Sequence, residues 1–223
     1  MVVYGNTPWL MDDLATAIIS RESKILKDIR KSATEIDQGE QTVFYQQGQL
    51  LSILARMASA TSVLEIGTFV GYSAAILAQA ITMNGEDKGK HVVTLENNPD
   101  YVATARENMK FAGLDKVVEV IQGDALETLE KFSESEQFDF VFIDADCKNN
   151  IEYTKRALAL STKNVTIVVN RLIQNGEVYD GDTNLFTEYV NWLAEQDDLD
   201  ASLLQTNHLN YWDGMVFIRR AFN

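Results

Sequence analysis

Residues 62–81 read SVLEIGTFVGYSAAILAQAI, and this stretch decides the fold class. The apolar run 62–66 has the length and composition of a buried strand, and 73–81 has those of a helix. Between them lie Gly67 and Gly71, which suit a turn just beyond the strand. A strand, a glycine-containing turn and a helix in succession predict a parallel sheet with crossover helices.

The alternation of strand and helix continues along the chain. Further near-continuous apolar runs predict strands at 91–96, 117–123, 138–146 and 165–170. Amphipathic segments follow them, which predicts helices on both faces of the sheet. The last two strand patterns, 201–206 and 214–220, have a short connection and predict an antiparallel hairpin at one edge.

The first quarter of the chain has a different character. Apolar residues recur at helical spacing over 10–30 and 47–59, so we expect helices there. A chain of 223 residues suits one domain. We therefore predict a single doubly wound α/β domain over 1–223, with a helical N-terminal extension (1–59) ahead of the α/β core (60–223).

Composition and charge limit the class of partner. The formal net charge of −14 disfavours nucleic acid and anionic membranes, which require clustered Lys and Arg. The N-terminus lacks the pattern of a signal peptide, and no uncharged apolar run of 18 residues occurs. Cys147 is the one cysteine, which excludes an intramolecular disulfide. We expect a cytoplasmic protein whose partner is a small molecule.

Acidic residues occur at three successive predicted strand ends. Glu65 stands in the first strand, Glu96 ends the second, and Asp124 follows the third. In doubly wound sheets, ligands bind beyond these carboxyl ends. Glu96 suits two ribose hydroxyls, Asp124 suits an adenine amino group, and Glu65 suits an ammonium and a sulfonium. The turn after the first strand is not the dinucleotide glycine motif, so an adenosyl ligand fits better than a dinucleotide.

Several motifs together resemble those of the S-adenosylmethionine (SAM)-dependent O-methyltransferases of the catechol and caffeoyl-CoA type. The resemblance runs from about residue 40 to the C-terminus. The motifs are FYQQGQLL (44–51), VLEIGTFVGYSA (63–74), VVTLENNP (92–99), GDALETL (123–129), FDFVFIDAD (138–146) and DGMVFIRR (213–220).

The resemblance implies a seven-stranded methyltransferase sheet of the Rossmann-like kind, with its last strand antiparallel. It also implies SAM as the cofactor and, in many members, a homodimer. By matching motif positions, it implies a SAM site lined by Glu65, Gly67, Tyr72, Ser73, Glu96, Asp124, Ala125 and Asp144.

The chain departs from this family where a divalent metal is expected. The family holds Mg²⁺ with the first aspartate of DADK and with the aspartate and asparagine of VVDN. Here Asp144 matches the first position, but Asn170 and Arg171 occupy the other two, and Cys147 replaces the lysine expected to act as base. One carboxylate and one amide beside a guanidinium make a poor Mg²⁺ site, so we expect no metal.

The role of Arg171 has two interpretations. Its guanidinium can substitute for the metal by polarising an acceptor oxygen or by pairing with an acidic acceptor. Alternatively, it pairs with Asp144 and closes the site. We assign Asp144, Asn170 and Arg171 to the catalytic end of the site.

The general base stays open. Lys148 and His208 are weaker candidates, and Cys147 as a nucleophile is weaker still, because methyl transfer from a sulfonium needs no covalent enzyme intermediate. Tyr211 and Trp212 suit either an acceptor wall or the cover of a sheet edge.

The sequence thus predicts a SAM-dependent methyltransferase that acts on an oxygen of a small, aromatic acceptor without a metal. Two alternatives remain. One is a SAM-binding protein without transfer activity, and the other is a metal-dependent O-methyltransferase that uses Asp144 and Asn170 as ligands. The identity of the acceptor does not follow from the sequence.

Overall fold

The computed structural model describes residues 18–19, 22–36, 42–83, 89–133, 136–173, 185–208 and 211–221, with the backbone alone at 207–208 and 211–212. Its strands are β1 (Ser62–Ile66), β2 (His91–Glu96), β3 (Val118–Gln122), β4 (Phe138–Ile143), β5 (Ser161–Val169), β6 (Leu199–His208) and β7 (Tyr211–Arg220). Its helices are α2 (Lys24–Glu35), α3 (Tyr45–Met57), α4 (Tyr72–Thr82), α5 (Pro99–Ala112), α6 (Ala125–Leu129), the short 3-10 helix η2 (Cys147–Asn149), α7 (Asn150–Ala159) and α8 (Leu185–Ala194).

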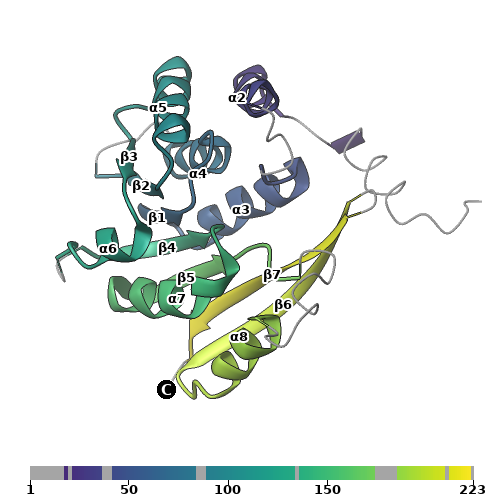
Figure 1. Cartoon of the computed structure of the whole chain (residues 1–223), viewed down its shortest axis with the longest axis vertical. Coiled ribbons are helices and arrows are strands. Elements are labelled where there is room, and N and C mark those ends of the chain that lie inside the picture. Colours follow the sequence, from purple (N-terminus) through teal and green to yellow (C-terminus); the bar gives the residue numbers. More distant parts are fainter. Residues whose placement is uncertain are drawn as a thin grey trace, which may run out of the picture.

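The strands form one sheet in the order β3-β2-β1-β4-β5-β7-β6. The pairs from β3 to β5 are parallel, whereas β7 runs antiparallel to both β5 and β6. Figure 1 shows the twisted sheet with helices on both sides. The predicted fold class is confirmed, including the antiparallel last strand and the hairpin at the edge.

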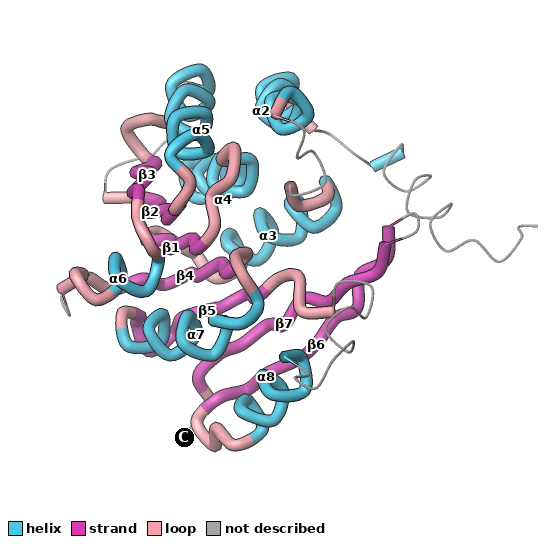
Figure 2. The backbone as a smooth tube through the Cα atoms, in the orientation of Figure 1, coloured by secondary structure: helices cyan, strands magenta, loops and turns pink. Residues whose placement is uncertain are grey.

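Each face of the sheet has its own hydrophobic core. One core packs side chains such as Val63 and Phe140 against α3, α4 and α5. The other packs Leu64 and Val141 against α6, α7 and α8. Neighbouring residues of a strand point to opposite faces, and here both faces are apolar, so the strands read as continuous apolar runs. Figure 2 shows the two helix layers on either side of the strands.

The topology creates a switch point beside β1. The chain adds β2 and then β3 on one side of β1, and then returns to place β4 on the other side. The chain continues from β1 to α4 on one face of the sheet and from β4 to α7 on the other, which leaves a crevice at the carboxyl end of the sheet, where ligands bind in folds of this kind.

Most predicted boundaries differ from the observed ones by three residues or fewer, and those of two elements differ by more. A helix over 10–30 was expected, but residues 22–23 are not helical, and α2 starts after Ser23, whose Oγ caps it by accepting from Leu26 N at 3.2 Å. Strand β5 begins at Ser161 rather than at 165. Its first residues include an exposed polar stretch, and its register against β4 shifts there. A polar irregularity of this kind lacks the strand pattern.

Within the described ranges, no helix is long and apolar enough to cross a bilayer.

Candidate active site

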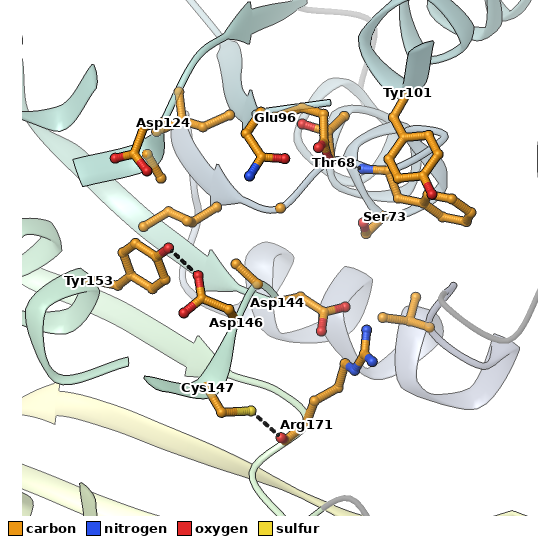
Figure 3. Close-up of a pocket in the computed structure, with 18 of the residues that line it drawn as sticks. Thr68, Ser73, Glu96, Tyr101, Asp124, Asp144, Asp146, Cys147, Tyr153 and Arg171 are labelled. Carbon is orange, nitrogen blue, oxygen red and sulfur yellow. Dashed lines mark hydrogen bonds between the residues drawn. The ribbon is translucent and has the colours of Figure 1, made fainter. Parts of the chain in front are cut away.

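A cavity of about 790 Å³ opens at the switch point (Figure 3). Its wall comes from the segments after four neighbouring strands, namely 66–69, 95–97, 123–125 and 144–148. Arg171, after β5, adds a fifth strand end. Loops from distant parts of the sequence thus meet because parallel strands end at one edge of the sheet.

Most of the predicted site residues line this cavity. They are Gly67, Tyr72, Ser73, Glu96, Asp124, Ala125, Asp144 and Arg171. Glu65 and Asn170 are not among the lining residues, and they are 0% and 4% exposed. Glu65 lies one residue before the end of β1, inside the sheet, so it sits behind the wall rather than in it.

Gly67 lets two loops approach closely. Its φ is +96°, and a Cβ built there would lie 2.2 Å from the carbonyl oxygen of Asp144. Only glycine fits such an approach without displacing a backbone. The turn after β1 is therefore pressed against the loop after β4, which forms a narrow cradle for a ligand.

Glu96 is oriented by the backbone on both of its oxygens. Its Oε2 accepts from Phe69 N at 2.8 Å, and its Oε1 accepts from Asn98 N at 2.9 Å. Each carboxylate oxygen has a second lone pair. The arrangement fixes the carboxylate at the cavity wall with acceptor capacity left for hydroxyl groups of a ligand.

Asp124 also acts as a helix cap. Its Oδ1 accepts from Glu127 N at 3.1 Å at the start of α6. The cap holds the carboxylate at the cavity wall beside Ala125, the first residue of the helix. Asp124 thus has a structural role as a helix cap in addition to its predicted contact with adenine.

Glu65 is a fully buried carboxyl group. Burial raises its pKa to about 8, and the charges of Asp144 and Glu96 add to the shift. The hydroxyls of Ser73 and Thr94 oppose it. Oε2 accepts from Thr94 Oγ1 at 2.5 Å, whereas Oε1 has no hydrogen-bond partner among the described residues. At neutral pH this carboxyl is therefore largely protonated.

Tyr72 connects the cavity with the N-terminal extension. Its hydroxyl donates to Glu22 Oε1 at 2.6 Å. Arg30, on α2, holds the same carboxylate with two hydrogen bonds, of 3.1 and 2.8 Å. Burial raises the pKa of the Tyr72 phenol, so it stays protonated. Residues ahead of and within α2 are thus tied to the first turn of α4.

Asp144 lies between an amide and a guanidinium at the far end of the cavity. Burial raises its pKa to about 6, the positive charge of Arg171 and the Asn170 amide lower it, and Asp213 raises it. Figure 3 shows the Arg171 side chain extending toward the Asp144 carboxylate. Oδ1 of Asp144 and Oδ1 of Asn170 are buried and lack partners within the part of the chain that the structure describes.

These residues do not fit a divalent metal. A single carboxylate of raised pKa, one amide oxygen and a nearby guanidinium give too little negative charge for a hard cation. Across the described ranges, no group of three His, Cys, Asp or Glu side chains could hold a metal ion. An organic cation is a better match for the unpartnered Asp144 oxygen, because it supplies hydrogen-bond donors as well as charge.

Cys147 is a poor nucleophile or base in this setting. Burial raises its pKa to about 11, so the thiol stays protonated at neutral pH. Its Sγ donates to the carbonyl oxygen of Arg171 at 3.0 Å. That residue has a positive φ of 59°, and the contact braces it. The side chain of Lys148 lines the cavity and is exposed. The side chains of His208, Tyr211 and Trp212 lie outside the described residues.

The structure adds residues that the sequence reasoning missed. Phe69 and Tyr101 stack edge to face in the wall, with ring centroids 4.9 Å apart. Tyr153 on α7 donates to Asp146 Oδ2 at 2.7 Å, and both line the cavity. Phe69 lies in the glycine turn already identified, and Asp146 is the last residue of a predicted strand. Nothing in the sequence around Tyr101 or Tyr153 marks them, because both lie on helices.

Comparisons with known proteins agree on one class. A model of the family described as O-methyltransferase matches residues 16–221. The chain is 38% identical over 175 residues to a catechol O-methyltransferase of Mycobacterium tuberculosis, covering 77% of each chain. It is 31% identical over 213 residues to a catechol O-methyltransferase of Niastella koreensis, covering 92% of this chain and 94% of that one.

A solved structure gives the same result. The O-methyltransferase TomG from Streptomyces achromogenes, in complex with SAM, superposes with a TM-score of 0.87 at 30% identity. The match covers 96% of this chain and 97% of that one.

Proposed function

This chain belongs to the O-methyltransferase family and is a SAM-dependent O-methyltransferase, and from that premise we propose that it methylates a small aromatic acceptor without a divalent metal. The observation that carries the proposal is the positive charge of Arg171 beside Asp144, with Asn170 as the third member of the group. In this proposal, the guanidinium does the electrostatic work of the missing cation.

We assign the cofactor to the acidic part of the cavity. The unpartnered oxygens of Glu65 and Asp144 support this assignment, since each can accept from or attract a cationic group. The oriented Glu96 carboxylate suits ribose hydroxyls, and the cradle at Gly67 suits a close backbone contact. The proposed cofactor-binding residues are Glu65, Gly67, Tyr72, Ser73, Glu96, Asp124, Ala125 and Asp144.

When bound, SAM supplies a methyl group activated by its attachment to a positively charged sulfur. The contribution of the protein is to align the acceptor oxygen with that methyl group and to exclude water. Arg171 would stabilise the negative charge on the acceptor oxygen as it loses its proton. The thiol of Cys147 stays protonated at neutral pH and is therefore unsuited to take the proton of the acceptor hydroxyl. We assign no general base.

A metal-dependent alternative has one observation in its favour. Oδ1 of Asp144 and Oδ1 of Asn170 have no hydrogen-bond partner among the described residues, and both could coordinate a cation. The guanidinium of Arg171 opposes that cation by charge repulsion, and we therefore favour the metal-free transfer.

We also propose a cytoplasmic homodimer. A chain with one cysteine, and so without an intramolecular disulfide, suits a reducing compartment. The exposed large apolar side chains of the described structure include pairs on two elements, Ile53 and Met57 on α3 and Leu203 and Leu204 on β6. Light scattering coupled to size-exclusion chromatography would give one chain mass if the dimer is wrong.

The test uses SAM with a labelled methyl group and a panel of small phenols and catechols, with chelator present. We expect methylated product in chelator and no increase with millimolar Mg²⁺. Arg171→Met should lower kcat/KM by about 10²–10³-fold, as loss of one oxyanion-stabilising group does elsewhere, and Arg171→Lys should recover part of it.

Arg156→Met is the matched control, because Arg156 pairs with Glu130 at the surface, where both side chains are exposed. It should leave the rate unchanged. Product that forms only with Mg²⁺, or full activity in Arg171→Met, would refute the metal-free proposal.

A further inference from the structure

A chain of three side chains runs from the interior of the sheet to the cavity. Thr68 Oγ1 lies 2.6 Å from Thr94 Oγ1, which in turn lies 2.5 Å from Glu65 Oε2. Glu65 and Thr94 are paired residues of β1 and β2, and both are 0% exposed. Of the three, Thr68 alone lines the cavity. It is the point at which a ligand could contact the chain.

The direction of these hydrogen bonds depends on Glu65. A hydroxyl has one proton to donate, and an ionised carboxylate can only accept. With Glu65 ionised, Thr94 donates to it and Thr68 donates to Thr94. Thr68 has then used its proton and presents only lone pairs to the cavity. With Glu65 protonated on Oε2, both bonds can reverse, and Thr68 presents its proton to the cavity instead.

We propose that the Glu65–Thr94–Thr68 chain couples cofactor binding to the release of one proton. The cationic amino-acid part of the cofactor binds the form in which Glu65 is ionised and Thr68 accepts. In this scheme Glu65 loses its proton to the buffer when the ligand's ammonium enters the cavity. Thr94 is a positioning residue, because it acts through Glu65 and Thr68. The inference rests on the proposed assignment of the cofactor to this cavity.

The surroundings of Glu65 explain why the free protein holds the proton. The charged groups near it are Asp144 after β4 and Glu96 at the end of β2, both negative, and α4 contributes the Ser73 hydroxyl. Burial and these two charges favour the neutral acid, and Oε1 has no partner among the described residues. A ligand ammonium nearby reverses that balance, because an opposite charge favours the ionised form.

Linkage fixes the sign of the pH dependence. The bound state holds one proton fewer at Glu65. Cofactor affinity therefore rises with pH below the pKa that Glu65 has in the free protein, by up to about tenfold per pH unit. At pH 7.0 the free Glu65 is mostly protonated, and Asp144, with a pKa of about 6, is mostly ionised. The ligand's own α-amino group is also mostly protonated there.

Isothermal titration calorimetry measures the released proton directly. The parent protein is titrated at pH 7.0 in several buffers of different ionisation enthalpy. The slope of the observed binding enthalpy against the buffer ionisation enthalpy gives the number of protons released. The probes are S-adenosylhomocysteine, which has the ammonium, and 5′-methylthioadenosine, which lacks the amino-acid part. We expect about 0.7–0.9 proton released with the first probe and close to none with the second.

Variants assign the proton to the chain. Thr94→Val keeps the shape and removes the middle hydroxyl, and should reduce the release by at least half, whereas Thr94→Ser should restore it. Glu65→Gln should abolish the release and the pH dependence of affinity. Thr104→Val is the matched control, because the Thr104 hydroxyl donates to the Asp100 carbonyl oxygen within α5 and does not line the cavity. It should release as many protons as the parent.

Two results would overturn the inference alone. They are binding of S-adenosylhomocysteine without proton release, and equal release in Thr94→Val and the parent. No binding of either probe to the parent would instead overturn the proposed cofactor site, and this inference with it. Thermal melts of each variant identify any that is unfolded, and Thr94→Ser then carries the comparison.

Discussion

Replacing Gly67 with alanine should damage both the fold and the site. The residue has a φ of +96°, which costs an L-residue roughly 1–2 kcal/mol. The added Cβ would also lie 2.2 Å from the Asp144 carbonyl oxygen, so one of the two loops must move. Forced overpacking of this kind typically costs about 1–3 kcal/mol more. The total is about 2–5 kcal/mol of unfolding free energy.

Gly113→Ala separates the two contributions. Gly113 has a φ of +68°, and a Cβ there meets nothing within 4 Å. It should therefore carry only the backbone cost. In a chain of this length, each 1 kcal/mol lowers Tm by about 2–4 °C, so Gly67→Ala should melt roughly 2–12 °C below Gly113→Ala.

Urea and thermal unfolding of both variants measure the difference, and calorimetry with S-adenosylhomocysteine measures the site. Gly67→Ala should bind at least about tenfold more weakly than Gly113→Ala, because the displaced loop carries Asp144. Equal unfolding free energies in the two variants would refute the argument from close approach.

Three further predictions concern Glu96, Glu65 and the positions at which the family holds its metal. Glu96→Gln should weaken S-adenosylhomocysteine binding by about 1.5–3 kcal/mol, measured by calorimetry, and unchanged affinity would contradict the ribose assignment. Combining Cys147→Lys, Asn170→Asp and Arg171→Asn should create Mg²⁺ binding that Asn170→Asp alone does not, and equally tight binding by the parent would contradict it. The unfolding free energy of Glu65→Gln minus that of the parent should rise between about pH 4.5 and 8, because in this window the folded parent keeps the Glu65 proton and the unfolded parent loses it. A difference that does not change with pH would contradict the raised pKa of Glu65.

The sheet was predictable because its signals are local. Each buried strand is a short apolar run, and its order along the chain restricts the topologies that a doubly wound sheet can adopt. Both ends of α5 also carry local signals, because Asn98 caps its start, Pro99 is its first residue and Gly113 caps its end. The start of β5 was not, since polar residues there interrupt the apolar pattern without ending the strand.

The site was predictable where it follows strand ends and less so elsewhere. Glu96 ends β2, Asp124 lies two residues after β3 and Asp144 directly follows β4, so their meeting at one edge follows from parallel pairing. Tyr153 reaches the cavity from a helix, and its contact with Asp146 depends on the turn at η2, which sequence periodicity does not specify. The position of Glu65 behind the wall depends on where β1 ends, and single-residue boundaries are the weakest part of any pattern argument.

The insertion of β7 between β5 and β6 has a consequence for biosynthesis. During translation, β5 emerges from the ribosome with no partner for the edge that β7 will cover, and β6 emerges before the strand that attaches it to the sheet. Strand β5 can pair with β4, but its other edge stays open and β6 cannot join the sheet until residues 211–220 have left the exit tunnel. An open, apolar strand edge is a template for pairing with other chains. A nascent or truncated chain that lacks residues 211–220 therefore exposes the edge of β5 that can pair with other chains. Binding of chaperones to the nascent chain should be strongest just before the final strand is made.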